Sequence, residues 1–170
     1  YALLLFYLAT GMRRREVAQL RWGDLRINGT IHLAGEVKGG TYREREVDNP
    51  AGKDALLAYL EASGRLAGMT ADAPLWTSHA SANVNPDAPL TSHAIAKRFK
   101  GYAREAGVGD FHLHQLRHTF ARIVSEETGS IIETQDALGH ADPGTTRVYV
   151  QRIAVKRDKH SRDVTRRLGV

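Results

Sequence analysis

The 170-residue sequence has the length of one domain and can bury a sizeable hydrophobic core. Lysine and arginine together number 24 against 19 aspartates and glutamates, and the resulting formal net charge of +5 suits a polyanionic partner. The absence of cysteine excludes disulfides and thiolate metal sites. The strongest apolar run, residues 1–9, is far shorter than the roughly 20 residues of a membrane span and lacks the basic lead-in of a secretory signal, so we expect no membrane partner.

The start of the chain predicts two consecutive helices. Residues 1–9 are apolar almost all round, as in a buried helix, and Gly11 suits the left-handed position just past its end. Residues 14–20 predict a second, short helix, with Arg13 at its entry and Glu16 three residues later. Arg13 belongs to a run of three arginines, and we expect the other two to be solvated.

A small sheet follows. Residues 25–33 alternate between apolar and polar side chains about an Asn-Gly pair, which is typical of a hairpin. A Gly-Gly pair at residues 39–40 marks a second turn, and residues 42–47 supply a third strand. We therefore predict a three-stranded antiparallel sheet near residues 25–48 that holds Lys38 at a strand end or turn.

Helices and loops make up the rest of the chain. Residues 54–61 predict a helix with Leu56, Leu57 and Leu60 inward, and residues 63–90, rich in Gly, Ala, Pro, Ser and Asn, predict mostly loop. Thr91 caps the next helix, which Gly107 ends. The apolar stripe of that helix consists of Ile95, Phe99, Tyr102 and Ala106. The predicted fold class is thus α+β and mainly α-helical.

Another face of the helix after Thr91 is basic. Lys97, Lys100 and Arg104 fall together on it at helical spacing. Such a face can lie on DNA phosphates or simply in water, and the sequence favours neither.

The helix that begins at His114 carries a chemically useful pair. Its predicted buried stripe is Leu116, Phe120, Ile123 and Val124, while His114 and Arg117 project together from another face. A guanidinium matches the paired oxygens of a phosphate, and a histidine holds or moves a proton near neutral pH. A metal site from His112, His114 and His118 is a weaker alternative, because Arg117 would place a cation against the metal and no carboxylate or thiolate stands nearby.

The last third of the chain predicts two more helices. Residues 130–133 have the form of a capping box, and the helix they start ends at residues 138–140. Asp142 and Pro143 begin another helix, which carries Tyr149. A basic stretch, residues 156–167, follows.

These motifs make the chain resemble the catalytic domain of the tyrosine recombinases, the phage integrase family, over nearly its whole length. Residues 10–17, Thr-Gly-Met-Arg-Arg-Arg-Glu-Val, are similar to the first box of the family, with its arginine at Arg13 and its acidic partner at Glu16. Lys38 takes the place of the hairpin lysine, although the surrounding Val-Lys-Gly-Gly departs from the tighter family pattern. Lys53 is a poor substitute, because it lies beyond the predicted sheet.

The second half of the resemblance lies in the later motifs. Residues 114–121, His-Gln-Leu-Arg-His-Thr-Phe-Ala, are similar to the second box throughout, which gives His114 and Arg117. Leu-Gly-His at residues 138–140 resembles the third box and gives His140. Tyr149, nine residues later, occupies the nucleophile position.

The resemblance implies an enzyme that cleaves and rejoins DNA strands without a metal ion, ATP or any other cofactor. Tyr149 would attack a backbone phosphate and form a 3′-phosphotyrosyl intermediate with a free 5′-hydroxyl. Arg13, supported by Glu16, and Arg117 would contact the non-bridging oxygens. The remaining candidate roles are a further hydrogen bond from His140, a general base at His114 and a general acid at Lys38.

The resemblance also implies partners and context. Double-stranded DNA is the expected partner, and we expect self-association on paired DNA sites, as a tetramer with DNA, with a monomer as the alternative in isolation. The expected location is cytoplasmic and nucleoid-associated. We expect residues 1–170 to be a fragment that lacks the DNA-clamping N-terminal domain and the first helix of the catalytic domain. Residues 156–170 are a candidate exchange segment that docks on a neighbouring subunit, with packing on its own domain or fraying as the alternatives.

Two rival functions use similar residues. A type IB topoisomerase has a comparable set of catalytic residues but relaxes supercoils. The residues of the boxes favour a recombinase. A DNA-binding module that has lost catalysis would have no need of all six chemical groups.

Overall fold

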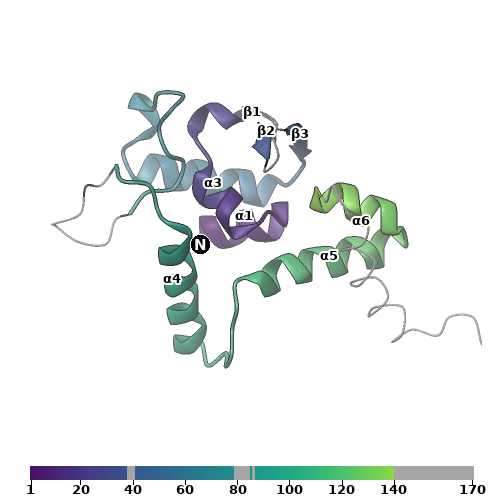
Figure 1. Cartoon of the computed structure of the whole chain (residues 1–170). Coiled ribbons are helices and arrows are strands. Elements are labelled where there is room, and N and C mark those ends of the chain that lie inside the picture. Colours follow the sequence, from purple (N-terminus) through teal and green to yellow (C-terminus); the bar gives the residue numbers. More distant parts are fainter. Residues whose placement is uncertain (38–40, 79–84, 86, 140–170) are drawn as a thin grey trace, which may run out of the picture. The chain divides into compact units, whose positions relative to one another are not determined.

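A computed structural model describes residues 1–37, 41–78, 85 and 87–139 of the chain (Figure 1). Their contacts divide the chain into two compact units, Tyr1–Arg117 and His118–Val170. The predicted class is confirmed, because helices dominate the described residues and three antiparallel strands form one small sheet. No helix among these residues is long and apolar enough to cross a membrane.

The first two helices of the first unit match their prediction closely. Helix α1 spans Ala2–Thr10 and ends at Gly11, whose φ of 58° and ψ of 15° are left-handed values that suit a residue without a Cβ atom. Helix α2 spans Arg14–Gln19, with Arg13 as its N-cap residue. A short 3₁₀ turn that the sequence did not predict, η1 (Trp22–Asp24), leads from α2 into the sheet.

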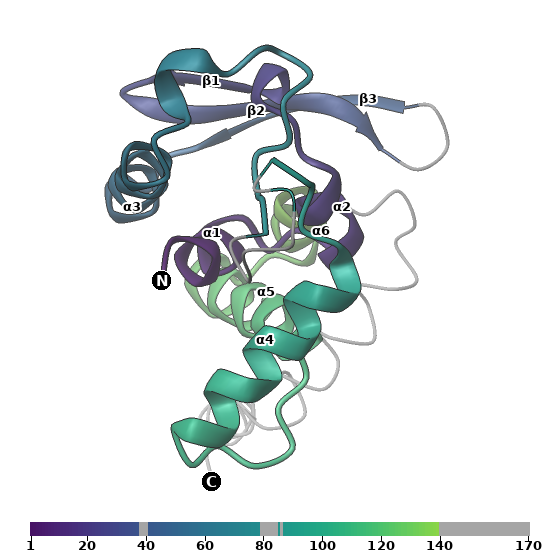
Figure 2. The same ribbon diagram turned by 90° about the vertical axis from the view of Figure 1, so that its left-hand side faces the viewer.

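The sheet consists of β1 (Leu25–Asn28), β2 (Thr30–Val37) and β3 (Thr41–Val47) in that order. Its register pairs Asn28 with Thr30, so Gly29 alone turns the chain, at a φ of 81°. Strands β2 and β3 pair from Ile31 with Val47 to Val37 with Thr41. Figure 2 shows the strands as one layer with helix α3 on one face. The predicted sheet near residues 25–48 is therefore confirmed.

Helix α3 (Pro50–Ala62) begins earlier than the predicted residues 54–61. The side chain of Asn49 accepts a hydrogen bond from the Gly52 amide at 2.7 Å, and Pro50 occupies the first turn. The Asn-Pro pair is thus an N-cap signal as well as the end of the sheet. Leu56 and Leu60 are fully buried and Leu57 is half-buried. The loop predicted over residues 63–90 is interrupted by one 3₁₀ turn, η2 (Leu66–Gly68), in its described part.

One hydrophobic core serves the first unit. Side chains from α1, the sheet and α3 meet in it, and Trp76 from the long loop fills it with its ring 5.4 Å from that of Phe6 and 5.1 Å from that of Tyr59. Each large apolar side chain buried there contributes about 1.5–3 kcal/mol. Because α1 belongs to this core, the residues that follow it start from a fixed position.

Helix α4 (Ser92–Glu105) is capped by Thr91, whose hydroxyl accepts from the Ala94 amide at 3.1 Å. Ile95 and Phe99 are buried as predicted. The rest of the predicted stripe is wrong, since Tyr102 is 59 % exposed and Ala106 is also exposed. Burial along α4 stops at Phe99, so its second half presents an apolar residue to solvent.

Helix α5 (His114–Thr128) starts in the first unit and continues into the second, where helix α6 (Ile131–Leu138) follows. The predicted buried stripe of α5 is displaced by one residue. Arg117, Ala121 and Ser125 are buried, Leu116, Phe120 and Val124 are half-buried, and Ile123 is 52 % exposed. Residues four apart share a helix face, so these three buried residues lie along one face of α5.

The capping signal of α6 is confirmed. The Ser130 hydroxyl accepts from the Glu133 amide at 3.2 Å, and Gly139 ends the helix in a left-handed conformation. The predicted helix that begins at Asp142 and carries Tyr149 lies outside the described residues.

Candidate active site

The turn between α1 and α2 is the platform of the site. Its backbone is fixed from within by three contacts: the Thr10 hydroxyl donates to the Phe6 carbonyl at 2.7 Å, the Gly11 amide to the Tyr7 carbonyl at 2.9 Å, and the Met12 amide lies 3.4 Å from the Thr10 hydroxyl. Thr10 and Gly11 are buried. The backbone that leads into Arg13 is therefore rigid.

Arg13 is held by Glu16 in two ways. The Glu16 carboxylate accepts from the Arg13 backbone amide at 2.7 Å, as the carboxylate of a capping box does, and from Nη1 of its guanidinium at 2.8 Å. The Arg13 side chain remains 47 % exposed and that of Glu16 is 22 % exposed. The guanidinium is thus oriented on one side and accessible to an anion on the other.

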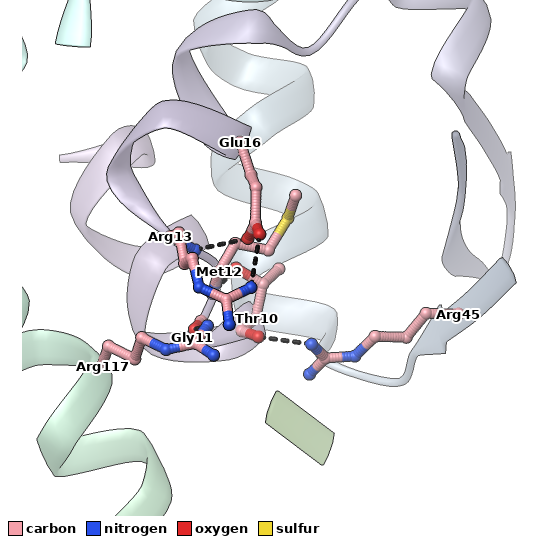
Figure 3. A network of polar contacts seen from close by, with 7 residues as sticks. All are labelled: Thr10, Gly11, Met12, Arg13, Glu16, Arg45 and Arg117. Carbon is pink, nitrogen blue, oxygen red and sulfur yellow. Dashed lines mark hydrogen bonds and ion pairs between the residues drawn. The ribbon is translucent and has the colours of Figure 1, made fainter. Parts of the chain in front are cut away.

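Arg117 reaches the same turn from α5. Its Nη1 donates to the carbonyl oxygen of Gly11, and the residue is only 4 % exposed. Figure 3 shows the guanidinium groups of Arg13 and Arg117 at the same turn, although the two residues are 104 positions apart in the sequence. A guanidinium group stays charged near neutral pH even when it is buried. The turn therefore carries two cations in fixed positions.

His114 lies at the start of α5 and is exposed. The helix start is held by the Gln115 side chain, which accepts from the His112 amide at 2.8 Å in the manner of a capping box. Arg117, one turn later, is buried, so the histidine and the guanidinium differ in exposure as well as in chemistry.

Three predicted site residues, Lys38, His140 and Tyr149, lie outside the described residues. The described strands end on either side of Lys38, since Val37 of β2 pairs with Thr41 of β3. The described helix α6 ends at Gly139, one residue before His140. Their candidate roles remain predictions.

The basic face of α4 is where the sequence placed it. Lys97, Lys100 and Arg104 are all exposed, on the side of the helix away from buried Ile95 and Phe99. Among the described residues, no three histidine, cysteine or acidic side chains form a set that fits a metal ion, which gives the alternative built on His112, His114 and His118 no support.

The sequence reasoning missed one arginine beside the site. Nη1 of Arg45, in β3, donates to the Thr10 carbonyl oxygen at 2.5 Å (Figure 3). A signal for it existed: Arg45 and Val47 are two residues apart and share a face of the strand, and Val47 is buried. An arginine on the buried face of a strand needs a partner, because an unpaired buried charge is costly.

Comparison with known proteins identifies the family of the chain. The model of the phage integrase family matches residues 1–154 of the chain. The chain belongs to the phage integrase family. Its relatives include the tyrosine recombinase XerC of Xanthomonas axonopodis pv. citri, 32 % identical over 149 residues, and that of Pseudomonas aeruginosa, 33 % identical over 154 residues. Each alignment covers 87 % of this chain but only 45 % and 46 % of the relative, so the chain spans less than half of their length.

Solved structures of family members have a similar fold. A complex of the XerH site-specific recombinase with its difH substrate before cleavage is 27 % identical, with a TM-score of 0.70 over 87 % of this chain and 41 % of that one. The XerA recombinase has a TM-score of 0.70 at 24 % identity, over 92 % of this chain and 55 % of that one, and so supports the fold alone.

Proposed function

We propose that this chain supplies the catalytic residues of a site-specific DNA recombinase, which cleaves and rejoins strands through a 3′-phosphotyrosyl intermediate. The observation that carries the proposal is the meeting of Arg13 and Arg117 at the turn after α1, with Glu16 orienting Arg13. Family membership and the relatives named tyrosine recombinase support it.

The arginines suit the charge that develops during phosphoryl transfer. A phosphodiester under attack gains negative charge on its non-bridging oxygens, and fixed cations stabilise that charge without reorganising. Arg13 is exposed enough to contact the phosphate, and Arg117 adds a second cation at the same turn. His140 adds a hydrogen bond to these oxygens. Two guanidinium groups thus serve where other enzymes use a metal ion.

The proposed reaction conserves the phosphoester bond. The phenolic oxygen of Tyr149 attacks phosphorus, the bond to the 5′ oxygen breaks, and a phosphotyrosyl bond replaces it. His114 takes the phenolic proton and Lys38 gives a proton to the departing 5′ oxygen. A 5′-hydroxyl from another strand then reverses these steps and releases the tyrosine. No nucleotide is consumed, because one phosphoester is exchanged for another.

Cleavage alone does not separate a recombinase from a type IB topoisomerase. The two differ in the 5′-hydroxyl that attacks the intermediate, which comes from a different strand in the recombinase. Relatives named recombinase and a neighbour solved as a recombinase on its substrate favour strand exchange.

Double-stranded DNA is the partner of this activity. The exposed face of Lys97, Lys100 and Arg104 on α4 is the proposed surface for backbone phosphates. Strand exchange needs several active sites at once, so we propose self-association on paired DNA sites, as a tetramer, with residues 156–170 as the docking segment.

Replacement of Tyr149 tests the activity. We expect Tyr149→Phe to bind DNA like the wild type but to form no covalent adduct, because phenylalanine keeps the ring and removes only the hydroxyl. The substrate is a pool of short duplexes randomised around a single nick, whose short 5′-hydroxyl strand dissociates after cleavage and traps the adduct. Denaturing electrophoresis measures the adduct. Tyr102→Phe, which removes the hydroxyl of an exposed tyrosine on α4, should form adduct normally. Undiminished adduct with Tyr149→Phe would refute the assignment.

A further inference from the structure

Arg45 reaches the active-site turn from the sheet. It lies in β3 opposite Leu33, which is buried, and its guanidinium donates to the carbonyl oxygen of Thr10 at 2.5 Å. The next carbonyl along the chain, that of Gly11, accepts from Arg117. Two consecutive carbonyl groups at the end of α1 are therefore each bound by an arginine, one from the sheet and one from α5 (Figure 3).

The two carbonyl groups are a suitable anchor for cations. They lie at the C-terminal end of α1, where the last carbonyl oxygens have no partner within the helix and the helix dipole is negative. Each arginine thus supplies a hydrogen-bond donor and a compensating charge. Arg13 is the N-cap residue of the next helix, two residues after Gly11, so the direction of its side chain depends on how this turn is held.

The carboxylate that orients Arg13 also acts electrostatically on Arg45. Burial of its guanidinium lowers the pKa of Arg45, and the negative charge of Glu16 acts in the opposite direction. The guanidinium is therefore a charged group at neutral pH whose field reaches the same carboxylate that Arg13 binds at 2.8 Å. Arg45 thus holds the backbone of the turn by a hydrogen bond and lies within the electrostatic influence of Glu16.

We propose that Arg45 is a positioning residue, which holds the turn after α1 so that Arg13 and Arg117 are placed for the scissile phosphate. This inference rests on the proposed function. It also connects two parts of the site, because β3 follows directly on residues 38–40, which include Lys38, while the turn carries Arg13. Arg45 itself contacts protein, and it acts through the two other arginines.

Two variants test the role on the randomised nicked duplexes. Arg45→Met keeps much of the volume and removes the donors and the charge, and we expect adduct formation to slow by roughly 10- to 100-fold, as for a small displacement of catalytic groups. Arg45→Lys keeps the charge and a hydrogen-bond donor but not the planar guanidinium. Its rate of adduct formation should therefore lie between those of the wild type and Arg45→Met. DNA affinity should change by less than about twofold, because Arg45 is bound to backbone and not to phosphate.

Arg65 provides a matched control within the same unit. Its guanidinium also donates to backbone carbonyl oxygens, those of Pro74 at 2.6 Å and Leu75 at 3.3 Å, but it belongs to a different loop. Arg65→Met should lower the melting temperature and leave the rate of adduct formation unchanged. Equal loss of rate in Arg65→Met and Arg45→Met, at matched stability, would overturn the positioning role.

A double mutant separates action through Arg13 from an independent effect. In the Arg13→Ala background, Arg45→Met should slow the reaction much less than it does in the wild type, because the group it positions is already gone. If the two substitutions acted independently, the rate of the double variant would fall by the product of the two single losses. That result would contradict the proposal.

Guanidinium resonances provide a readout that does not depend on cleavage. In arginine-labelled protein, Arg45→Met should shift or broaden the Nε–Hε signals of Arg13 and Arg117, and Arg65→Met should not. Absence of an adduct with the wild type would count against the proposed function, but these signals would still test the role of Arg45. Signals of Arg13 and Arg117 that do not change in Arg45→Met would overturn the positioning role.

Discussion

At the scale of single residues, the site is built from arginines with different surroundings. Arg117 is almost fully buried and Arg13 is about half exposed. A buried cation with a backbone partner is held in place before the substrate arrives, which is what transition-state stabilisation requires. An exposed cation oriented by a carboxylate is accessible to the phosphate. The difference in burial therefore fits a division between a fixed charge and a contacting one.

Tyr7 gives a prediction about stability at high pH. Its hydroxyl donates a long hydrogen bond, 3.5 Å, to the Arg14 carbonyl, and burial raises the pKa of the phenol above its ordinary value of 10.0. Above pH about 10 the unfolded chain releases this proton while the folded chain keeps it, so the free energy of unfolding falls as pH rises. We expect a shallower fall in Tyr7→Phe.

Chemical denaturation at a series of alkaline pH values measures this difference. Tyr1→Phe is the matched control, because Tyr1 is 89 % exposed, and its curve should follow that of the wild type. Parallel curves for Tyr7→Phe and the wild type would show that burial of this phenol does not drive the alkaline loss.

The predictability of the site residues depends on sequence distance. Glu16 lies three positions after Arg13, so helical geometry alone predicts their contact. The contact of Arg45 with Thr10 joins residues 35 positions apart and depends on how the sheet packs. The contact of Arg117 with Gly11, 106 positions apart, was not predicted, and only the family resemblance placed Arg13 and Arg117 in one site. Local geometry cannot supply contacts of the last two kinds.

At the scale of elements, caps and turns were more predictable than buried faces. The N-caps at Thr91 and Ser130 and the helix end at Gly11 depend on single residues and their neighbours. Buried stripes depend on what packs against a helix. The polar contact of Arg117 turns an arginine inward on α5, and the exposure of Tyr102 ends the buried stripe of α4 early. Hydrophobic periodicity predicts neither the burial of Arg117 nor the exposure of Tyr102.

The basic face of α4 gives a prediction about binding. If its side chains contact phosphates, each one lost should reduce the slope of log affinity against log salt by about 0.9. We therefore expect a clearly flatter slope for a variant in which Lys97, Lys100 and Arg104 are all replaced by glutamine. Titration of a labelled duplex at several salt concentrations measures the slope.

Arg122→Gln is a control that also removes a positive charge. Arg122 is an exposed arginine of α5 whose Nε lies 3.0 Å from the Glu126 carboxylate, so its charge is already paired. It should leave the slope nearly unchanged. A slope that is unaltered in the α4 variant as well would mean that this face lies in water.

At the scale of the whole molecule, one set of catalytic residues would cleave one strand in the proposed reaction, so exchange between duplexes would need several sets held together. The proposed intermediate would keep the phosphoester energy in its phosphotyrosyl bond, so assembly and not an energy source would determine which 5′-hydroxyl completes the reaction. A means of association therefore belongs to the proposed function. The chain has apolar residues after Tyr149, at Val155, Val164 and Leu168, which an isolated surface tail gains little by carrying.

Removal of residues 156–170, which lie outside the described part of the chain, tests this docking. We expect single-site DNA binding to change little and assembly on duplexes that carry two sites to weaken by at least about tenfold, because a lost protein contact acts only between subunits. Light scattering or native electrophoresis on one-site and two-site duplexes, selected from the randomised pool, measures the difference. The segment also carries basic residues, and their loss as phosphate contacts would flatten the salt slope of single-site binding, whereas loss of a protein contact would not. Equal assembly by the truncated chain and by the chain that keeps residues 156–170 would exclude these residues as the docking segment.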